Sequence, residues 1–174
     1  MITFQIATAA DTAVIAGLHT RSWQQHYRGI YSDQYLDEDI AAERLAVWTE
    51  RMEHPKPNQH VILATDVGQP CGFACTYLDH DPEWGSLLDN LHVAFAWKGH
   101  GLGRELMRRS AEWVNGQKPG SCFHLYVLAD NTPAMHMYEH VGGKRMKTEL
   151  HTVPYGREAE VYLYVWEDCR VLLK

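Results

Sequence analysis

The sequence predicts a fold that mixes helices and strands (α/β in the broad sense, α+β in the strict one). It has one central sheet of about seven strands and about four flanking helices. Three patterns in the 174 residues point to it. Short runs alternate apolar and polar residues, as half-buried strands do, and longer segments repeat apolar residues every three or four positions, as helices do. A glycine-rich turn joins one predicted strand directly to a helix. No internal repeat or linker interrupts the chain, so residues 1–174 are expected to form a single domain.

The predicted elements follow the order β-α-α-β-β-β-α-β-α-β-β. Thr8 and Asp11 have the spacing of a capping box, which starts the first helix. The N-terminal half contains a strand at 3–8, helices at 8–25 and 38–52, a hairpin of strands at 61–65 and 71–78, and a strand at 84–93. The C-terminal half continues with a helix that ends before Gly116, a strand at 122–128, a helix after Asn131, and strands at 144–153 and 160–166 joined through Pro154, Tyr155 and Gly156.

The most informative segment is the turn after the strand at 84–93. It reads Lys98-Gly99-His100-Gly101-Leu102-Gly103-Arg104. Glycines let the backbone turn tightly and approach a ligand, and the helix that follows presents unpaired N–H groups and the positive end of its dipole. This combination is typical of a phosphate site. The spacing matches neither the dinucleotide fingerprint nor the Walker loop, which disfavours a nucleotide-binding oxidoreductase.

A second segment lies about thirty residues further along the chain. Asn131 is a good N-cap, Pro133 occupies the first helical turn, and Gly142 with Gly143 ends the helix. Apolar residues recur at three- and four-residue spacing and place the Tyr138 ring on the packed face. Its hydroxyl needs a partner there, which is either backbone in an ordinary core or a ligand.

Together the two segments resemble the signatures of the GCN5-related N-acetyltransferase (GNAT) superfamily, whose acyl-CoA pyrophosphate loop reads R/Q-x-x-G-x-G/A. The motifs cover residues 88–143, and the order of elements agrees over nearly the whole chain. The resemblance implies a mixed, mostly antiparallel sheet with a splayed central strand pair. It also implies acetyl-CoA as cosubstrate, with Lys98 standing where the family usually has Arg or Gln.

The resemblance places the cofactor on particular residues. The backbone of the central strand would pair with the pantetheine arm, the loop amides would hold the pyrophosphate, and Asn131 would contact the arm. Tyr138 would protonate the leaving CoA thiolate. The cofactor-binding residues expected on this basis are Leu91, His92, Val93, Lys98, Gly99, His100, Gly101, Leu102, Gly103, Arg104, Asn131 and Tyr138.

The implied chemistry requires a base, because an amine attacks a thioester only when it is neutral. Asp89 and His92 lie on the central strand and are the two candidates. Successive residues of a regular strand point to opposite faces, so at most one of them is expected to face the acceptor. Asp89 as a structural cap and His92 as a packed histidine are the alternatives.

Aromatic residues form the expected acceptor site. The segment around Trp23, Tyr27 and Tyr31 resembles a W-x-x-x-Y-x-G-I pattern found in bacterial members of the superfamily, and its rings could stack on an acceptor. Trp84 is expected on the opposite wall. A packed helix-helix corner is the alternative for Trp23.

Composition limits the other possibilities. The net charge of −6 and the lack of a basic stripe argue against nucleic acid. No apolar stretch reaches membrane-spanning length, so a cytoplasmic protein without membrane partners is expected. No metal is expected, because His136 and His140 lack a third ligand at motif spacing. The leading function is an acetyl-CoA-dependent N-acetyltransferase acting on a small or peptide amine, with a possible homodimer. A non-catalytic acyl-CoA-binding module and a structural interaction domain are the alternatives.

Overall fold

The computed structural model describes residues 1–152 and 158–174. Within these residues seven strands form one sheet in the order β1-β2-β3-β4-β5-β7-β6. All neighbours pair antiparallel except β4 and β5, which are parallel, so the predicted mixed, mostly antiparallel sheet is confirmed. The strands are β1 (Ile2–Ile6), β2 (Gln59–Asp66), β3 (Gln69–Asp81), β4 (Gly85–Val93), β5 (Phe123–Leu128), β6 (Lys144–Thr152) and β7 (Glu158–Trp166).

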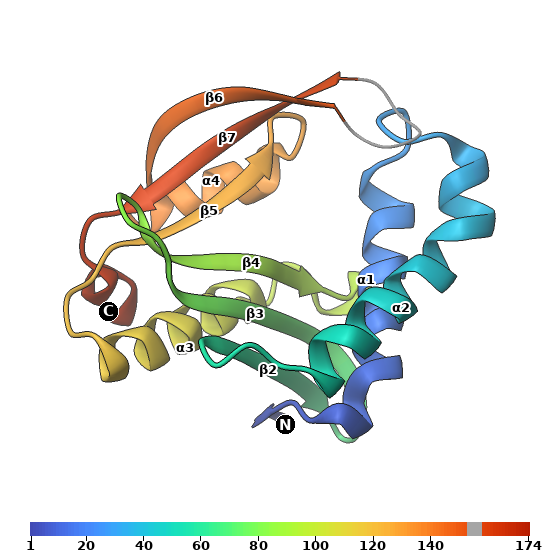
Figure 1. Cartoon of the computed structure of the whole chain (residues 1–174), viewed down its shortest axis with the longest axis horizontal. Coiled ribbons are helices and arrows are strands. Elements are labelled where there is room, and N and C mark those ends of the chain that lie inside the picture. The colour runs from blue at the N-terminus through green and yellow to red at the C-terminus, as the bar shows by residue number, and fades with distance from the viewer. Residues whose placement is uncertain (153–157) are drawn as a thin grey trace.

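Helices cover both faces of the sheet (Figure 1). One face is covered by α1 and α2 over the half of the sheet that holds β2 and β3, while α3 and α4 lie on the other face. The helices are α1 (Thr12–His26), α2 (Ile40–Glu53), α3 (Leu102–Gln117) and α4 (Thr132–His140). Short helical turns at Ala9–Asp11, Tyr35–Asp39, Phe95–Trp97 and Cys169–Leu173 complete the helical elements.

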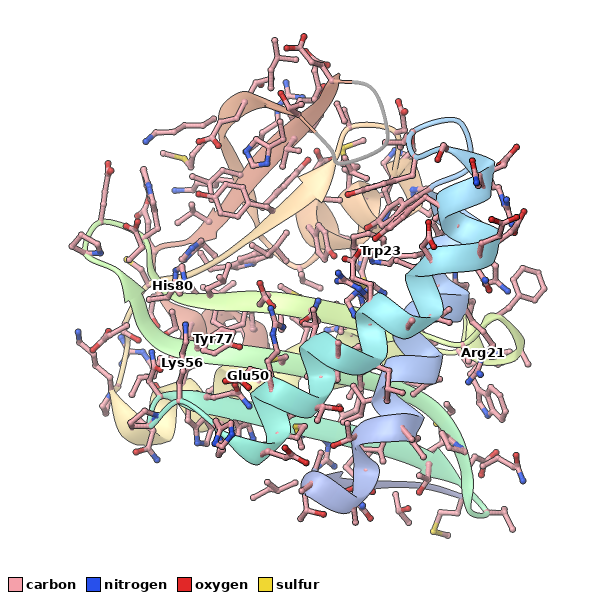
Figure 2. The ribbon with its side chains drawn as sticks, turned by 45° about the vertical axis from the view of Figure 1, so that its right-hand side comes forward. Arg21, Trp23, Glu50, Lys56, Tyr77 and His80 are labelled. Atoms are coloured by element: carbon pink, nitrogen blue, oxygen red, sulfur yellow. The ribbon has the colours of Figure 1, made fainter. Side chains whose placement is uncertain are left out.

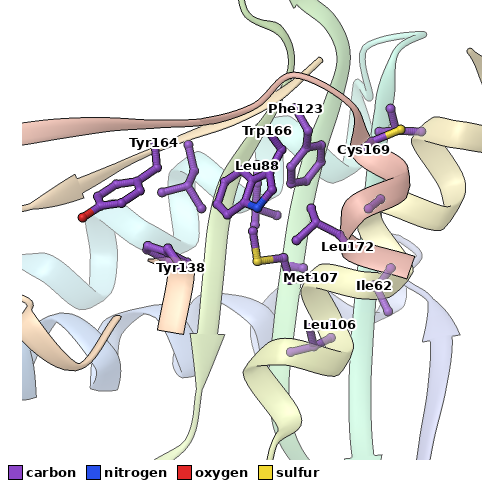
Figure 3. Packing of buried hydrophobic residues seen from close by; sticks show 14 of the residues in the cluster. Ile62, Leu88, Leu106, Met107, Phe123, Tyr138, Tyr164, Trp166, Cys169 and Leu172 are labelled. Atoms are coloured by element: carbon purple, nitrogen blue, oxygen red, sulfur yellow. The ribbon is translucent and has the colours of Figure 1, made fainter. Parts of the chain in front are cut away.

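Each face has its own apolar core. On the α3 and α4 face, Met107 of α3 and Tyr138 of α4 pack with Phe123 and Trp166 of the sheet, as Figure 3 shows. On the α1 and α2 face, Trp48 and its neighbours pack on β3 in a separate cluster. Fully burying a large apolar side chain contributes roughly 1.5–3 kcal/mol. The two clusters therefore fix the helices to the two faces of the sheet.

The predicted strands and helices are all present, with ends that differ from those of the structure by a few residues. The capping box is present, since the Thr8 amide donates to Asp11 Oδ2 at 2.8 Å. Helix α3 was expected to end before Gly116, but it continues through Gly116 to Gln117, so that prediction is wrong. Gly116 keeps a helical backbone, and the positive φ that leads out of the helix belongs to Gly120 (φ 70°). The predicted connection through Pro154, Tyr155 and Gly156 lies outside the described residues.

Gly85 holds together the point where β4 meets β5. Its φ is +71°, and a Cβ there would lie 2.4 Å from the carbonyl oxygen of Cys122. That carbonyl accepts the amide of Ser86 at 3.0 Å, beside the first residue pair that joins the two strands. A side chain at Gly85 must therefore push the strands apart.

We expect Gly85→Ala to lower the free energy of unfolding by about 2–5 kcal/mol, from left-handed strain plus overpacking. Gly68→Ala is the matched control, because Gly68 also has a positive φ, of +79°, but nothing lies within 4 Å of its Cβ position. It should cost only about 1–2 kcal/mol. Urea unfolding of both variants checks this, and equal losses would contradict the steric role of Gly85.

Candidate active site

The candidate site is a cleft that opens where β4 and β5 separate. The two strands pair only at Ser86 with Phe123 and at Leu87 with His124. Beyond these pairs, residues 88–93 of β4 and 125–128 of β5 line opposite sides of a cleft of about 680 Å³. This volume is within the range of small-molecule sites. The unpaired backbone groups of both strands are thus available to a ligand.

The glycine loop closes one end of the cleft. Gly99 and Gly101 both have a φ of +79°, and a Cβ at either position would meet nothing within 4 Å. Gly101 is the N-cap of α3 and provides no side-chain cap, so the first N–H groups of this helix are open to a ligand. Gly99, Gly101, Leu102, Gly103 and Arg104 all line the cleft, whereas His100 of the same loop is not among its lining residues.

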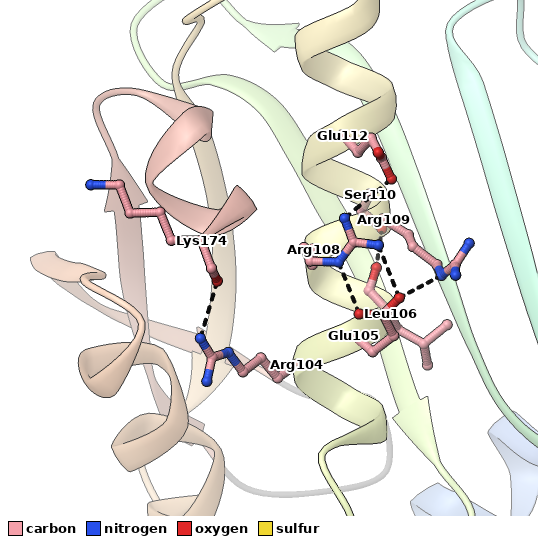
Figure 4. Close-up of polar contacts among 8 residues, drawn as sticks. All are labelled: Arg104, Glu105, Leu106, Arg108, Arg109, Ser110, Glu112 and Lys174. Carbon is pink, nitrogen blue, oxygen red and sulfur yellow. Dashed lines mark hydrogen bonds and ion pairs between the residues drawn. The ribbon is translucent and has the colours of Figure 1, made fainter. Parts of the chain in front are cut away.

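The two cations of the loop are held in different ways. The Lys98 ammonium contacts Nε2 of His26 on α1, and it lines the cleft. The Arg104 guanidinium donates to the carbonyl of Lys174 at 3.2 Å, away from its neighbours Arg108 and Arg109, which bind Glu105 (Figure 4). Lys98 therefore offers a charge to the cleft, and Arg104 offers its backbone amide.

Tyr138 and Asn131 come from α4 on the β5 side. The Asn131 side chain accepts the amide of Ala134 at 3.4 Å and so caps the helix, while the residue also lines the cleft. Tyr138 is 7% exposed, and its ring packs against Tyr164 and Trp166. Its hydroxyl has no hydrogen-bond partner among the described residues. Burial, with a smaller effect of nearby Tyr27, raises the pKa of Tyr138, so it stays protonated at neutral pH.

A β-bulge in β4 changes which side chains face α1 and α2. Cys75 of β3 pairs with Asn90, but the next residue, Thr76, pairs with Leu88, so Asp89 is an extra residue in the strand. Asp89 and Asn90 both bind Arg51 of α2, and His92 binds Ser22 of α1. Asp89 and His92 therefore lie on the same face, and the predicted alternation between them is wrong. The bulge is the reason, since it shifts the alternation by one residue.

Asp89 is engaged in an ion pair. Arg51 Nη1 lies 2.7 Å from Asp89 Oδ2 and 2.9 Å from Asn90 Oδ1. Among the described residues that line the cleft, Asp89 is the one carboxylate. Its charge is thus compensated by a fixed guanidinium next to the cleft.

Two histidines form the inner wall on the α1 side. His92 Nδ1 lies 2.8 Å from the hydroxyl of Ser22, and its ring centroid is 4.6 Å from that of His19. Burial, helped by nearby His26, Lys98 and Arg44, lowers the pKa of His92 to about 3. Burial, helped by His92 and by two arginines, lowers the pKa of His19 far below its usual range. Both rings are therefore neutral at physiological pH.

This burial predicts an acid-sensitive fold. The unfolded chain protonates His19 below its ordinary pKa of 6.5, while the folded protein does not, so stability is full above 6.5 and falls as the pH drops below it. Between pH 7.5 and 5.5 we expect His19 alone to cost about 1.4 kcal/mol, with His92 adding in the same direction. Urea unfolding at both pH values measures this. His19→Asn should flatten the dependence by that amount, and an unchanged slope would contradict the assignment.

The predicted acceptor residues divide into two groups. Trp23 and Tyr27 line the cleft, and Figure 2 shows Trp23 on the side of α1 that faces the opening between β4 and the β5–β7 half of the sheet. Tyr31 lies behind them, 5.0 Å from the Trp23 ring and stacked on Tyr35. Trp84 belongs to the turn that joins β3 to β4, where Lys147 lies 4.9 Å over its ring. The structure does not bring Tyr31 or Trp84 to the cleft.

Several lining residues were missed by the sequence analysis. They include His19, Ser22 and His26 of α1, Asn90 of β4 and Tyr126 of β5. The signal for the first three was present, because 19, 22, 23 and 26 follow the i, i+3, i+4, i+7 spacing of one helical face. The described residues contain no group of three or more His, Cys, Asp or Glu gathered around a metal position. Nor do they contain a helix that is long and apolar enough to cross a bilayer.

A splayed parallel strand pair beside a glycine loop defines an acetyltransferase type of fold, and solved structures agree. N-acetyltransferase PaiA from Thermoplasma acidophilum, in complex with coenzyme A, superposes with a TM-score of 0.72 at 17% identity, over 93% of this chain and 98% of that one. NAA60 from Arabidopsis thaliana, with a bisubstrate analogue, gives 0.73 at 16% identity, over 95% and 97%. A variant of spermidine N-acetyltransferase SpeG from Vibrio cholerae gives 0.71 at 16% identity, over 98% and 96%.

At these identities the structures show a shared fold and no more. No curated protein matches the sequence. The model of the acetyltransferase (GNAT) family, however, matches residues 20–143, which include both the glycine loop and α4. The chain belongs to the acetyltransferase (GNAT) family.

Proposed function

We propose that this protein transfers the acetyl group of acetyl-CoA to the primary amine of a small molecule or peptide, by direct attack within a ternary complex. The observation that carries the proposal is the cleft between β4 and β5, with an open helix N-terminus at one end and the buried, protonated Tyr138 on its wall. Family membership supports it.

The cleft has the features that a CoA thioester requires. Free N–H groups at the start of α3 and the Lys98 ammonium suit a pyrophosphate. Residues 91–93 pair with β3 but not with β5, and their free edge suits the amides of a pantetheine arm. Asn131 lines the same cleft. Acetyl-CoA supplies the activated acyl group, and the remaining chemistry falls to the residues of the chain.

In this proposal the amine nitrogen forms a bond to the thioester carbonyl carbon, and the carbon–sulfur bond then breaks. A backbone N–H near Val93 stabilises the negative charge on the carbonyl oxygen. The raised pKa of Tyr138 keeps its hydroxyl protonated at neutral pH, and this hydroxyl gives its proton to the departing thiolate. No covalent enzyme intermediate forms.

We assign the proton acceptor to His92 and not to Asp89. His92 is neutral down to about pH 3 and lines the cleft. In the tautomer in which Nδ1–H donates to Ser22, its Nε2 has the free lone pair that a proton acceptor needs. Asp89 lies on the same face but is already bound by Arg51. His92 orients the neutral amine through one N–H and takes the proton of the intermediate, whose ammonium is much more acidic than that of the free amine.

The test has two parts. Isothermal titration measures acetyl-CoA binding, and release of the CoA thiol measures transfer to a panel of amines. Binding together with amine-dependent thiol release supports the proposal. Binding without transfer to any amine would favour a non-catalytic acyl-CoA-binding module. A folded protein that does not bind acetyl-CoA would contradict both functions.

A further inference from the structure

The α1 wall of the cleft contains a buried hydrogen-bond donor that the transfer chemistry does not use. Trp48 Nε1 donates to His19 Nδ1 at 3.0 Å. Nδ1 must therefore be unprotonated, and because burial keeps His19 neutral, its one proton sits on Nε2. His19 is 2% exposed and lines the cleft, yet Nε2 has no hydrogen-bond partner among the described residues.

An unsatisfied buried N–H is costly, so this donor requires an explanation. The His19 ring is surrounded by other rings, with centroids of Trp23, Trp48, Phe73 and His92 at 5.3, 6.1, 5.9 and 4.6 Å. None of these accepts from Nε2. A partner for Nε2 must be a hydrogen-bond acceptor such as an oxygen atom, and a molecule in the cleft that His19 lines can supply one.

The charged residues of the α1 wall of the cleft also favour an acceptor that carries an oxygen over one that carries several ammonium groups. Asp89 is the one carboxylate among the described lining residues, and Arg51 compensates it at 2.7 Å. The Arg44 guanidinium lies 4.6 Å over the Trp23 ring and is paired with Glu43. An acceptor with several ammonium groups would find no free carboxylate here. An oxygen next to the reacting amine finds the Nε2–H donor of His19 and no free carboxylate among the described lining residues.

We propose that His19 selects the acceptor: the substrates are α-amino compounds, whose carbonyl or carboxylate oxygen accepts the Nε2–H of His19 while the adjacent amine reaches His92. The inference rests on the proposed acetyl transfer and narrows its substrate class. Trp48 acts as a positioning residue, because its N–H holds His19 in the donor tautomer. Trp23, Tyr27 and Tyr126 give the acceptor side chain an aromatic surface.

The weak base in the cleft supports the same class. With the pKa of His92 near 3, the site favours an amine that arrives neutral. An α-amino group next to an amide carbonyl, as at a peptide N-terminus, has a pKa of about 7.7–8.0 against about 10.4 for an alkylamine, so at pH 7.5 its neutral fraction is roughly 200-fold larger.

The experiment compares amines that differ only in the carbonyl group. The pairs are L-leucinamide with 3-methylbutylamine and L-phenylalaninamide with 2-phenylethylamine, and L-leucine and spermidine are added. Acetyl-CoA binding is titrated separately for each enzyme variant. The kcat/KM of each amine is measured by thiol release with the wild type, His19→Asn and His19→Gln. Asparagine can keep an acceptor for Trp48 but has no donor at the Nε2 position, whereas glutamine keeps a donor there.

We expect His19→Asn to lower kcat/KM for the amides about tenfold more than for the matched alkylamines, and His19→Gln to restore most of this difference. The double ratio cancels the difference in amine pKa. Activity on L-leucine comparable to that on leucinamide would support the class for both carboxylates and amides, and a preference for leucinamide would support it for amides and peptide N-termini. Equal losses for both members of each pair, or a wild type that binds acetyl-CoA and prefers spermidine or alkylamines, would overturn the inference. A wild type that does not bind acetyl-CoA would contradict the proposed acetyl transfer itself.

Discussion

Gly101→Glu is expected to weaken acetyl-CoA binding at least 100-fold. Gly101 is the N-cap of α3 with a φ of +79°, and its Cβ position faces open space in the cleft. A glutamate there places a carboxylate at the helix N-terminus where the proposed phosphates would lie, so its charge repels them and its side chain occupies their place. Left-handed strain adds about 1–2 kcal/mol to the cost of folding, which a thermal melt reports separately. Isothermal titration measures the affinity.

Gly116→Glu is the matched control. Gly116 lies near the opposite end of the same helix, also with open space at its Cβ position, and it is not a lining residue of the cleft. The two variants have the same net charge, so a general electrostatic effect would weaken binding in both. Undiminished affinity in a folded Gly101→Glu protein would show that the loop does not hold the pyrophosphate.

Tyr138→Phe is expected to lower kcat by about 10²–10⁴-fold, the range for removing a general acid. The hydroxyl has no hydrogen-bond partner among the described residues, so its removal leaves the packing against Tyr164 and Trp166 intact. Acetyl-CoA affinity and the free energy of unfolding should therefore stay nearly unchanged. Rapid measurement of thiol release at saturating acetyl-CoA, beside titration and urea unfolding, separates these effects.

Tyr164→Phe tests whether the loss is specific to the cleft. Tyr164 is a buried tyrosine with its ring centroid 5.8 Å from that of Tyr138, but its hydroxyl donates to Glu139 at 2.7 Å and it does not line the cleft. This variant should lose some stability and keep its kcat. A wild-type kcat in Tyr138→Phe would show that another group, such as water, protonates the leaving thiolate.

Much of the fold was predictable because its signals are local. Alternating and helical spacing predicted the number and order of strands and helices, and the Thr8–Asp11 capping box started its helix as expected. The glycine loop and α4 were readable for the same reason, since a positive φ, an N-cap and a helix stop each depend on a few neighbouring residues. The boundary at Gly116 failed because glycine permits a turn but does not require one.

Side-chain direction in the cleft was not readable in this way. Asp89 and His92 share a face only because β3 pairs with β4 through a bulge. The sequence of β4 alone does not predict this bulge. His19 became a donor through Trp48, 29 residues away, and His92 meets Ser22 at a separation of 70 residues.

The sequence thus contained the backbone framework of the protein, namely its element order, the glycine loop and the tyrosine on α4. The arrangement of the α1 wall of the cleft came from tertiary contacts, which brought Trp23 and Tyr27 to the cleft and left Tyr31 and Trp84 outside it. The physical reason is the range of the forces involved. Backbone conformation follows from steric and hydrogen-bonding preferences within a few residues, whereas the position, tautomer and charge of a buried side chain depend on groups that only folding places beside it.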